Sequence, residues 1–174
     1  RFFADHASPG VEAVTPGRYA RTFALDGHRG TLAVTNEADA LSVRIRGLGS
    51  AADHENILAR VRGMFDLDAD PRAIAAGLGR DPFTAALVGR RPGLRMPGAF
   101  DGFELAVRAI LGQQVSVAAA TRLAGRLVAG FGTPLDAETC GNEPGLTHLF
   151  PTPEQLVDAE ISLVLNMPRA RGRA

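Results

Sequence analysis

The sequence predicts an α+β fold, in which an antiparallel β-sheet is followed by a set of helices. Between Val11 and Ile45, apolar and polar residues alternate with a period of two, which is typical of strands with one solvent-exposed face. From residue 52 onward, apolar residues recur at helical spacing, and Gly- or Pro-containing turns separate the segments. The 174 residues are 45% hydrophobic and 22% charged, so the chain has an ordinary globular composition and can bury a core.

The first 46 residues predict a short helix and then the sheet. Residues 1–8 have the pattern of a helix end, which Pro9-Gly10 stops. A short strand at 11–15 precedes a hairpin over 21–34 that turns at Asp26-Gly27, and a last strand covers 41–45. Arg44 and Arg46 would lie on the exposed face of that strand, where they are either phosphate ligands or simply solvated.

Residues 52–65 predict a helix that covers the apolar face of the sheet. Asp70-Pro71 and Asp81-Pro82 each combine a capping Asp with Pro at the first helical position, so further helices begin at 71 and 82. The composition changes at 90–98. We therefore place a first, α+β domain at 1–90 and the beginning of a helical domain at 91–174.

Residues 103–128 predict two helices separated by a polar turn. Asp101 can cap the first helix, with Glu104 reaching back toward the cap. Gly112-Gln113-Gln114 interrupts the pattern, and Ser116 can cap the second helix. The predicted buried positions are Phe103, Val107, Ile110 and Leu111 in the first helix, and Val117, Ala120, Ala124, Leu127 and Val128 in the second.

The segment from 132 to 149 is rich in Gly, Pro and acidic residues. It is long for a loop without secondary structure, so we expect it either to be mobile or to pack on a surface outside this chain. Thr152-Pro153-Glu154-Gln155 then predicts a capping box and a short helix to about residue 159.

Several kinds of chemistry find no support in the sequence. All 19 basic residues are Arg, so no lysine can form a Schiff base. Cys140 is the single cysteine, and together with His148 it gives too few ligands for zinc. The string Asp66, Asp68, Asp70 lacks the Gly and Glu of an EF-hand. We predict no metal and no cofactor.

The sequence also bears on location. No apolar run reaches the ~18 residues of a membrane helix, and the lone thiol fits a reducing compartment. We predict a cytoplasmic protein that has no membrane partner. Net charge is zero and neither half is strongly basic, so charge alone does not identify a nucleic-acid binder.

Five segments, in order, resemble one known family: FFADHASPGVE (2–12), MFDLDADP (64–71), RPGLRMPGAFDGFE (91–104), FELAVRAILGQQVSVAAATRLAGRLV (103–128) and FPTPEQLVDAE (150–160). The chain resembles 3-methyladenine DNA glycosylase II of the AlkA type, in the helix-hairpin-helix glycosylase superfamily. The resemblance implies the N-terminal domain and the first helices of a truncated catalytic domain. The family's hairpin and catalytic Asp would lie beyond Ala174, so we expect no catalytic residue in this chain and no activity from these 174 residues alone.

The resemblance implies a monomeric, monofunctional base-excision-repair hydrolase. It would cleave the N-glycosidic bond of alkylated bases, such as 3-methyladenine, in double-stranded DNA. Phe2 would be a wall of the base pocket. The turn of Gly112, Gln113, Gln114, Val115 and Ser116 would bind DNA at the minor groove, where the family commonly has Leu as a wedge at the position of Gln114.

Two alternatives stay open. The chain could be a non-catalytic DNA-binding module, because this family is sometimes fused to an alkylation-response regulator. It could also be an α+β domain that binds a small molecule and shares only the helical packing.

Overall fold

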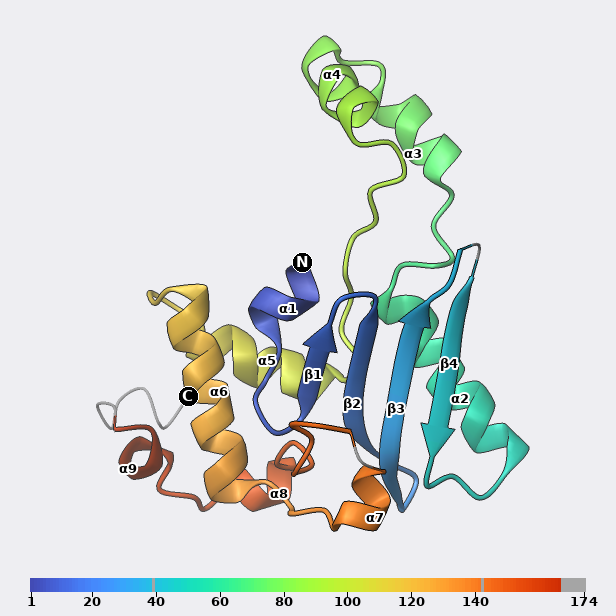
Figure 1. Ribbon diagram of the computed structural model, residues 1–174. Coiled ribbons are helices and arrows are strands. Elements are labelled where there is room, and N and C mark those ends of the chain that lie inside the picture. The colour runs from blue at the N-terminus through green and yellow to red at the C-terminus, as the bar shows by residue number, and fades with distance from the viewer. Residues whose placement is uncertain (39, 142, 167–174) are drawn as a thin grey trace. The chain divides into compact units, whose positions relative to one another are not determined.

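A computed structural model of the protein describes residues 1–38, 40–141 and 143–166 (Figure 1). It confirms the α+β class. The chain forms two compact units, one made of Arg1–His54 with Phe103–Ala174 and the other of Glu55–Gly102. The first unit is therefore discontinuous in sequence. The predicted domains, 1–90 and 91–174, divide the chain differently and stay a prediction.

Four antiparallel strands form one sheet in the order β1 (Glu12–Thr15), β2 (Arg18–Leu25), β3 (His28–Asn36), β4 (Leu41–Arg46). The predicted hairpin is confirmed, with Leu25 opposite His28 across a two-residue turn. Asp26 and Gly27 in that turn have φ of 48° and 83°. Positive φ at both positions matches the twist of the flanking strands, which is why Asp-Gly occurs there.

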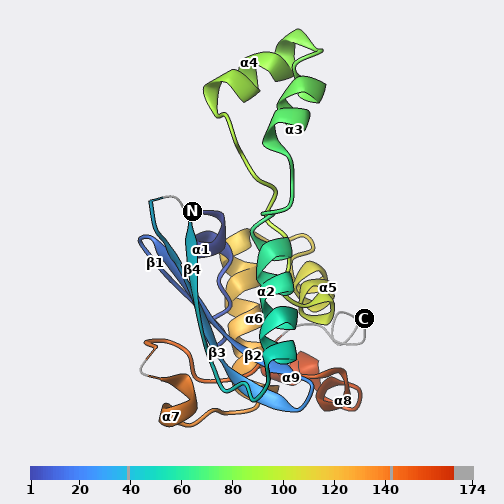
Figure 2. The same ribbon diagram turned by 90° about the vertical axis from the view of Figure 1, so that its right-hand side faces the viewer.

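The two central strands of the sheet are covered on both faces. The alternation of half-buried and exposed residues holds in β4, whereas five successive residues of β2 and of β3 are buried. On one face, Ala20 and Ala33 pack with Cys140 and Leu146 from the segment that contains α7 (Ala137–Cys140). Figure 2 shows α7 and α5 on opposite sides of the sheet. Small alanine side chains leave room for this second layer.

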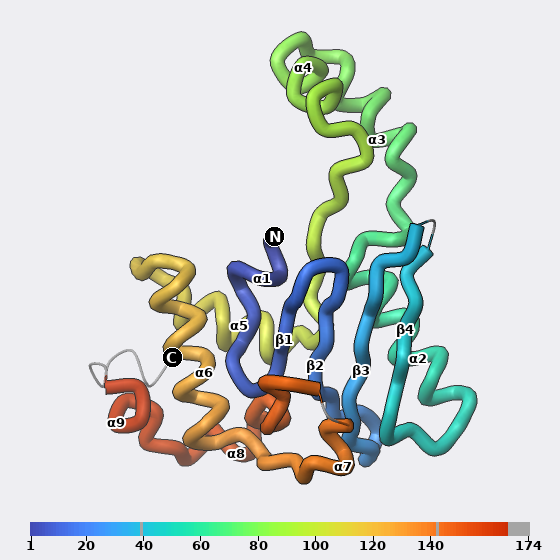
Figure 3. The backbone as a smooth tube through the Cα atoms, in the orientation of Figure 1, coloured from blue at the N-terminus to red at the C-terminus, as the bar shows by residue number. Residues whose placement is uncertain are grey.

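The expectation for residues 132–149 was therefore wrong. The segment packs on the sheet of this same chain, and Figure 3 shows its path across the lower end of the strands. Leu146 pairs with Gly10 and His148 with Pro134 in β-bridges. The Thr22 hydroxyl donates to the His148 carbonyl at 2.8 Å. The backbone groups of the segment are satisfied by partners far away in sequence, and sequence spacing does not reveal these partners.

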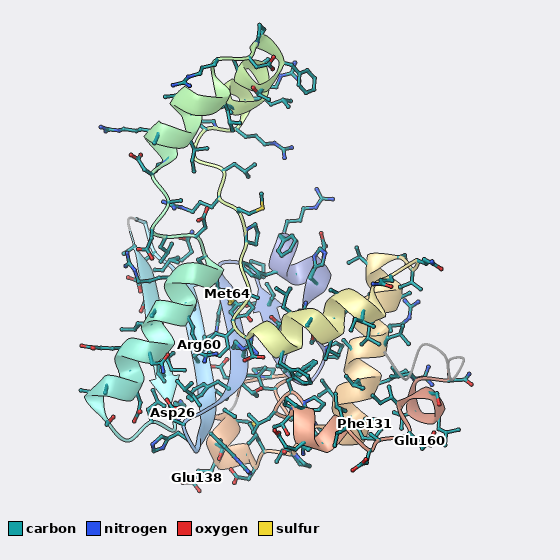
Figure 4. All side chains as sticks on the ribbon, turned by 180° about the vertical axis from the view of Figure 1, so that it is seen from behind. Asp26, Arg60, Met64, Phe131, Glu138 and Glu160 are labelled. Atoms are coloured by element: carbon teal, nitrogen blue, oxygen red, sulfur yellow. The ribbon has the colours of Figure 1, made fainter. Side chains whose placement is uncertain are left out.

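The remaining helices of this unit are α1 (Phe2–His6), α5 (Gly102–Leu111), α6 (Val117–Phe131), α8 (Pro153–Leu156) and α9 (Ile161–Leu165). Leu111, Ala124, Leu127 and Leu165 form their core. Phe131, labelled in Figure 4 at the end of α6, packs against it. The capping box at Thr152 is confirmed, since its hydroxyl accepts from Gln155 and the Gln155 side chain accepts from Thr152.

Two residues that we predicted to be buried are exposed. Ile110 is 37% exposed and Val117 is 46% exposed, so neither belongs to the core. The buried residues of α5 are Leu111 and Glu104, and the Glu104 side chain is 3% exposed. The helical period identified the correct face of the helix but not the chemical identity of every residue on it.

The second unit contains α3 (Pro71–Leu78), α4 (Pro82–Arg90) and most of α2 (Ala51–Met64). The predicted caps are confirmed, because Asp70 and Asp81 each accept two backbone N–H bonds at the start of α3 and α4. In α2, Ile57, Val61 and Met64 are buried while Leu58 is 40% exposed. That this helix covers the sheet stays a prediction. Among the described residues, no helix is both long and apolar enough to cross a membrane.

Candidate functional site

The turn between α5 and α6 presents a short polar surface. Gly112 N–H closes α5 by donating to the Arg108 carbonyl at 2.9 Å, and Gln113 N–H donates to the Ile110 carbonyl at 3.2 Å. Gln114 follows with φ of 59° and is exposed. Ser116 caps α6 as predicted, because its hydroxyl accepts from Ala119 N–H at 3.3 Å. A cap on one side and a left-handed residue in the middle fix the direction in which the turn projects.

Helix α1 carries two aromatic rings and an imidazole. Phe2 is 48% exposed, and its ring stacks on that of His6 with centroids 4.2 Å apart. His6 Nδ1 lies 2.8 Å from the Phe2 carbonyl. Phe3 instead packs on Tyr19 of the sheet, with centroids 5.3 Å apart. Phe3 therefore anchors α1, while Phe2 and His6 form a stacked pair.

A buried ion pair joins the sheet to α5. Arg21 Nη2 lies 2.6 Å from Glu104 Oε2, and both side chains are at most 5% exposed. Burial alone would lower the pKa of Arg21, but Glu104, Tyr19 and Glu12 together outweigh burial and raise the pKa. The Arg21 guanidinium therefore stays charged.

Arg108 extends this network to α1 and β1. Its guanidinium donates to Glu104 Oε1 and to Glu12 Oε2, each at 3.0 Å, and to the His6 carbonyl at the end of α1. The other Glu12 oxygen accepts from the Tyr19 hydroxyl at 2.6 Å. Burial raises the pKa of Tyr19 well above its ordinary value, and Glu12 adds to the rise although Arg21 opposes it. One planar, five-donor group thus fixes three elements relative to one another.

A pocket of about 210 Å³ lies between α1 and the turn. Its lining residues are His6, Arg108, Gly112, Val115, Val117, Ala120, Thr121 and Ala124. None of them carries a carboxylate, and Phe2 does not line the pocket. The cavity is smaller than the roughly 300–1,000 Å³ of sites for drug-sized ligands, so it suits a small group.

The structure brings Gly112, Val115 and His6 together around this pocket, although they are far apart in sequence. Sequence reasoning missed His6 and Arg108. His6 carried a usable signal, because it follows Phe2 by four residues and so shares its helical face. Arg108 carried none, since Arg on an amphipathic helix is usually solvated. The roles predicted for Phe2 and for the turn stay predictions.

Other candidate residues have structural partners. Cys140 is buried in the sheet's second layer, and burial raises the pKa of its thiol. Asp66 accepts from Met96 N–H at 2.9 Å, Asp68 pairs with Arg62, and Asp70 caps α3. The part of the chain that the structure describes holds no group of three or more residues suited to a metal ion. Arg44 and Arg46 are exposed, as on a solvated strand face.

The chain is similar to several characterised proteins. A family model described as the AlkA N-terminal domain matches residues 1–101. The chain is 42% identical over 173 residues to a protein of Mycobacterium tuberculosis named "Probable bifunctional transcriptional activator/DNA repair enzyme AlkA" and covers 98% of itself and 33% of that protein. It is 36% identical over 178 residues to DNA-3-methyladenine glycosylase 2 of Escherichia coli and covers 99% of itself and 58% of that protein.

Solved structures agree on the fold. A 3-methyladenine DNA-glycosylase from Archaeoglobus fulgidus superposes with a TM-score of 0.78 at 23% identity, over 98% of this chain and 58% of that one. An 8-oxoguanine glycosylase/lyase of Clostridium acetobutylicum in complex with double-stranded DNA gives 0.69 at 17% identity, over 97% and 55%. The chain therefore spans between a third and three fifths of the length of these relatives.

Proposed function

Because this chain belongs to the AlkA family, whose N-terminal domain its first 101 residues match, we propose that the protein carrying it is a DNA glycosylase. The proposed reaction is hydrolysis of the N-glycosidic bond of alkylated bases in duplex DNA. The oxygen of water bonds to the sugar carbon and releases a proton to solvent as the carbon–nitrogen bond breaks, and the base leaves with the bonding electrons. Alkylation makes the base a better leaving group, because a positively charged ring accepts those electrons readily.

This chemistry needs the damaged nucleotide outside the helix stack. The enzyme must unstack the base, hold it against aromatic or apolar faces, and fill the gap left in the duplex. One observation supports our proposal most directly. His6 of α1 and Gly112 and Val115 of the turn line one small pocket, although His6 and Gly112 lie 106 positions apart in the sequence.

We assign the turn of Gly112, Gln113, Gln114, Val115 and Ser116 to the minor groove. Gln114 is exposed, so its side chain is not part of the helical core, and its backbone has the left-handed conformation. A Gln fills the gap less completely than Leu, but its amide can hydrogen-bond the orphaned partner base. Phe2, half exposed on α1, is assigned to the aromatic surface beside the base.

The finer features of the proposal follow the family. We propose that the substrates include 3-methyladenine, that the protein acts as a monomer in the cytoplasm, and that it needs no cofactor. The absence of lysine from these residues supports simple hydrolysis over Schiff-base lyase chemistry within them.

The test uses the full-length gene product that contains these 174 residues. It is incubated in excess with duplexes that carry one 3-methyladenine or one unmodified adenine, and alkali then cleaves abasic sites. We expect strand cleavage only in the damaged duplex. Equal cleavage of both duplexes, or none above buffer, would refute the proposal.

A second function is favoured by the name of one relative, the M. tuberculosis protein described as a transcriptional activator as well as a repair enzyme. A regulatory DNA-binding module would bind undamaged DNA tightly near physiological salt. The logarithm of its affinity would fall with salt at a slope that corresponds to six or more phosphate contacts. The balanced charge of this chain instead favours weak binding with a shallow slope, which titrations at several salt concentrations would distinguish.

A further inference from the structure

We infer that Arg108 is a positioning residue for excision, because it holds helix α1, on which Phe2 lies, in a set place relative to the turn of residues 112–116. The inference rests on the proposed function, in which α1 and this turn act on the same nucleotide. The role needs no contact between the Arg108 guanidinium and the bond that breaks.

The Arg108 side chain contacts the end of α1. Its Nη2 donates to the carbonyl of His6, the last residue of that helix. With five residues, α1 is far shorter than the roughly 12–15 residues that even a marginally stable isolated helix needs, so contacts from outside decide where it lies. Phe3 makes one such contact with Tyr19 of the sheet, and Arg108 makes another from α5.

Two buried carboxylates hold the same guanidinium. Nη1 of Arg108 donates to Glu12 Oε2 on β1 and to Glu104 Oε1 one turn earlier in α5, each at 3.0 Å. The other Glu12 oxygen accepts from the Tyr19 hydroxyl at 2.6 Å. The other Glu104 oxygen accepts from Arg21, also at 2.6 Å. Because each carboxylate is held from two sides, the planar guanidinium between them has a fixed direction.

The Arg108 backbone contacts the turn. Gly112, the first residue of the turn, donates its N–H to the Arg108 carbonyl at 2.9 Å. Arg108 thus contacts α1 through its side chain and the turn through its main chain, and it lines the small pocket together with His6 and Gly112. An extruded base would lie beside α1 while the turn fills the gap in the duplex, so a shift of one part relative to the other would misplace the base.

A phosphate contact is the other role that an arginine beside a DNA-binding turn can have. The Arg108 side chain is 26% exposed, and its two terminal nitrogens already donate to three acceptors. Two of those acceptors are the carboxylates of Glu12 and Glu104, which offset its positive charge. We therefore expect Arg108 to affect the rate of excision and not the affinity for DNA.

The test compares the full-length parent with Arg108→Lys in single-turnover excision from a duplex that carries one 3-methyladenine. Lysine keeps the charge, but its ammonium cannot reproduce the planar fork that reaches two carboxylates and a carbonyl. We expect the maximal excision rate to fall about 10- to 100-fold, the effect of a small misplacement of the reacting groups. The enzyme concentration that gives half of the maximal rate should stay the same, because no contact with DNA is removed.

Arg60→Lys is the matched control. Arg60 also joins a main-chain carbonyl to a carboxylate, since its Nη1 lies 3.1 Å from the Phe100 oxygen and 3.6 Å from Asp101 Oδ2. Its side chain is 33% exposed, and it does not line the pocket. Its excision rate should equal that of the parent. An equal loss in both variants, or a parental maximal rate with a higher half-saturating concentration in Arg108→Lys, would overturn the inference.

A second measurement reports on α1 without any substrate. Amide hydrogen exchange in residues 2–7 should become about tenfold faster in Arg108→Lys, the effect of losing one hydrogen bond of ordinary strength. Exchange in strands β2 and β3 should stay at the parental rate. Unchanged exchange in α1, or an equal increase in the strands, would contradict the inference.

An ester in place of the amide between His6 and Ala7 answers the same question if Arg108→Lys does not fold. An ester carbonyl is a weaker acceptor, so this change weakens the contact of Arg108 with α1 while every side chain stays in place. It should lower the maximal excision rate, and a parental rate would overturn the inference. If the parent does not excise the damaged base, the proposed function fails and the inference fails with it. If the parent excises the base, and neither the rate nor the exchange in α1 depends on Arg108, the inference alone fails.

Discussion

Arg21 and Glu104 form a buried ion pair of 2.6 Å that links strand β2 to helix α5 across 83 residues of sequence. Glu104 also accepts from Arg108, at 3.0 Å. The Glu104 carboxylate therefore contacts two guanidinium groups, and Arg108 is also bound to Glu12 at 3.0 Å. We therefore expect the loss of Glu104 to lower the stability of the protein more than the loss of Arg21.

Glu104→Gln should destabilise the protein by about 3–5 kcal/mol, because it removes the carboxylate that the buried Arg21 contacts, whereas Arg108 keeps Glu12. Arg21→Met should cost less, since Glu104 keeps Arg108 and Met fills much of the space. Urea unfolding of both variants measures the difference. A larger loss for Arg21→Met would mean that side-chain packing, not charge, governs this site.

The alkaline limit of stability should depend on Tyr19. Burial raises its pKa in the folded protein, so the folded state holds the phenolic proton after the unfolded chain has lost it. Its contribution is complete below the unfolded pKa of about 10 and is lost as pH rises through the folded pKa. Unfolding free energy should therefore fall above about pH 10.

Tyr19 is the single tyrosine of the sequence, and there is no tryptophan, so ultraviolet absorbance of this chain reports phenolate formation at one residue. The folded chain should titrate at higher pH than the chain in urea. Tyr19→Phe should flatten the alkaline decline. Coincident titration curves in buffer and in urea would show that the phenol is accessible.

Gln114 should matter for excision and little for stability. As an exposed residue, Gln114→Ala should change unfolding free energy by well under about 1 kcal/mol. If the turn enters the minor groove, the same change should slow excision from well-paired duplexes and have less effect on mismatched or single-stranded substrates, where extrusion costs less. Gln114→Leu restores the family's usual wedge and should preserve activity.

Backbone strain supplies the control for that prediction. With φ at 59°, Gln114→Gly should be neutral or stabilising by up to about 1 kcal/mol, since glycine accepts this conformation freely. It should nonetheless slow excision as Gln114→Ala does. If Gln114→Ala melts far below the parent, or excises both kinds of substrate at the parental rate, the residue is scaffold.

Leu111 and Ile110, adjacent in α5, should separate core from surface. Leu111 is 6% exposed and Ile110 is 37% exposed. Leu111→Ala should cost about 2–5 kcal/mol through the cavity it leaves, and Ile110→Ala clearly less. Thermal melts of the two variants measure this, and similar losses would place Ile110 in the core as the helical period first indicated.

Local signals predicted much of this fold. The hairpin was predicted from Asp26-Gly27, and the helix starts were predicted from Asp70, Asp81, Ser116 and Thr152. Each of these residues acts on backbone groups a few residues away. Non-local burial was not predictable in this way. Arg21 sits in a strand and Glu104 in a first helical turn, where a charge is usually solvated. Only the meeting of the two in space makes their burial favourable.

The same distinction applies to the candidate site. The turn at 112–116 was recognised from its interruption of two helical patterns. The participation of His6 depends on packing between α1 and α6, and the covering of the sheet by residues 132–149 depends on alanines more than 100 positions earlier. Such contacts produce no periodic pattern in the sequence, so the sequence alone does not predict them.

The discontinuous unit has a consequence for the order of events on the ribosome. Strands β1 to β4 leave the exit tunnel early, yet the carboxylate that neutralises Arg21 is synthesised 83 residues later, and the layer over Ala20 and Ala33 later still. At about 5–20 residues per second, several seconds pass before Glu104 and the layer over Ala20 and Ala33 have been synthesised. A chain arrested near residue 101 should therefore depend on chaperones, although a family model ends there. Residues 1–101 therefore end before the partners that complete the first compact unit are synthesised.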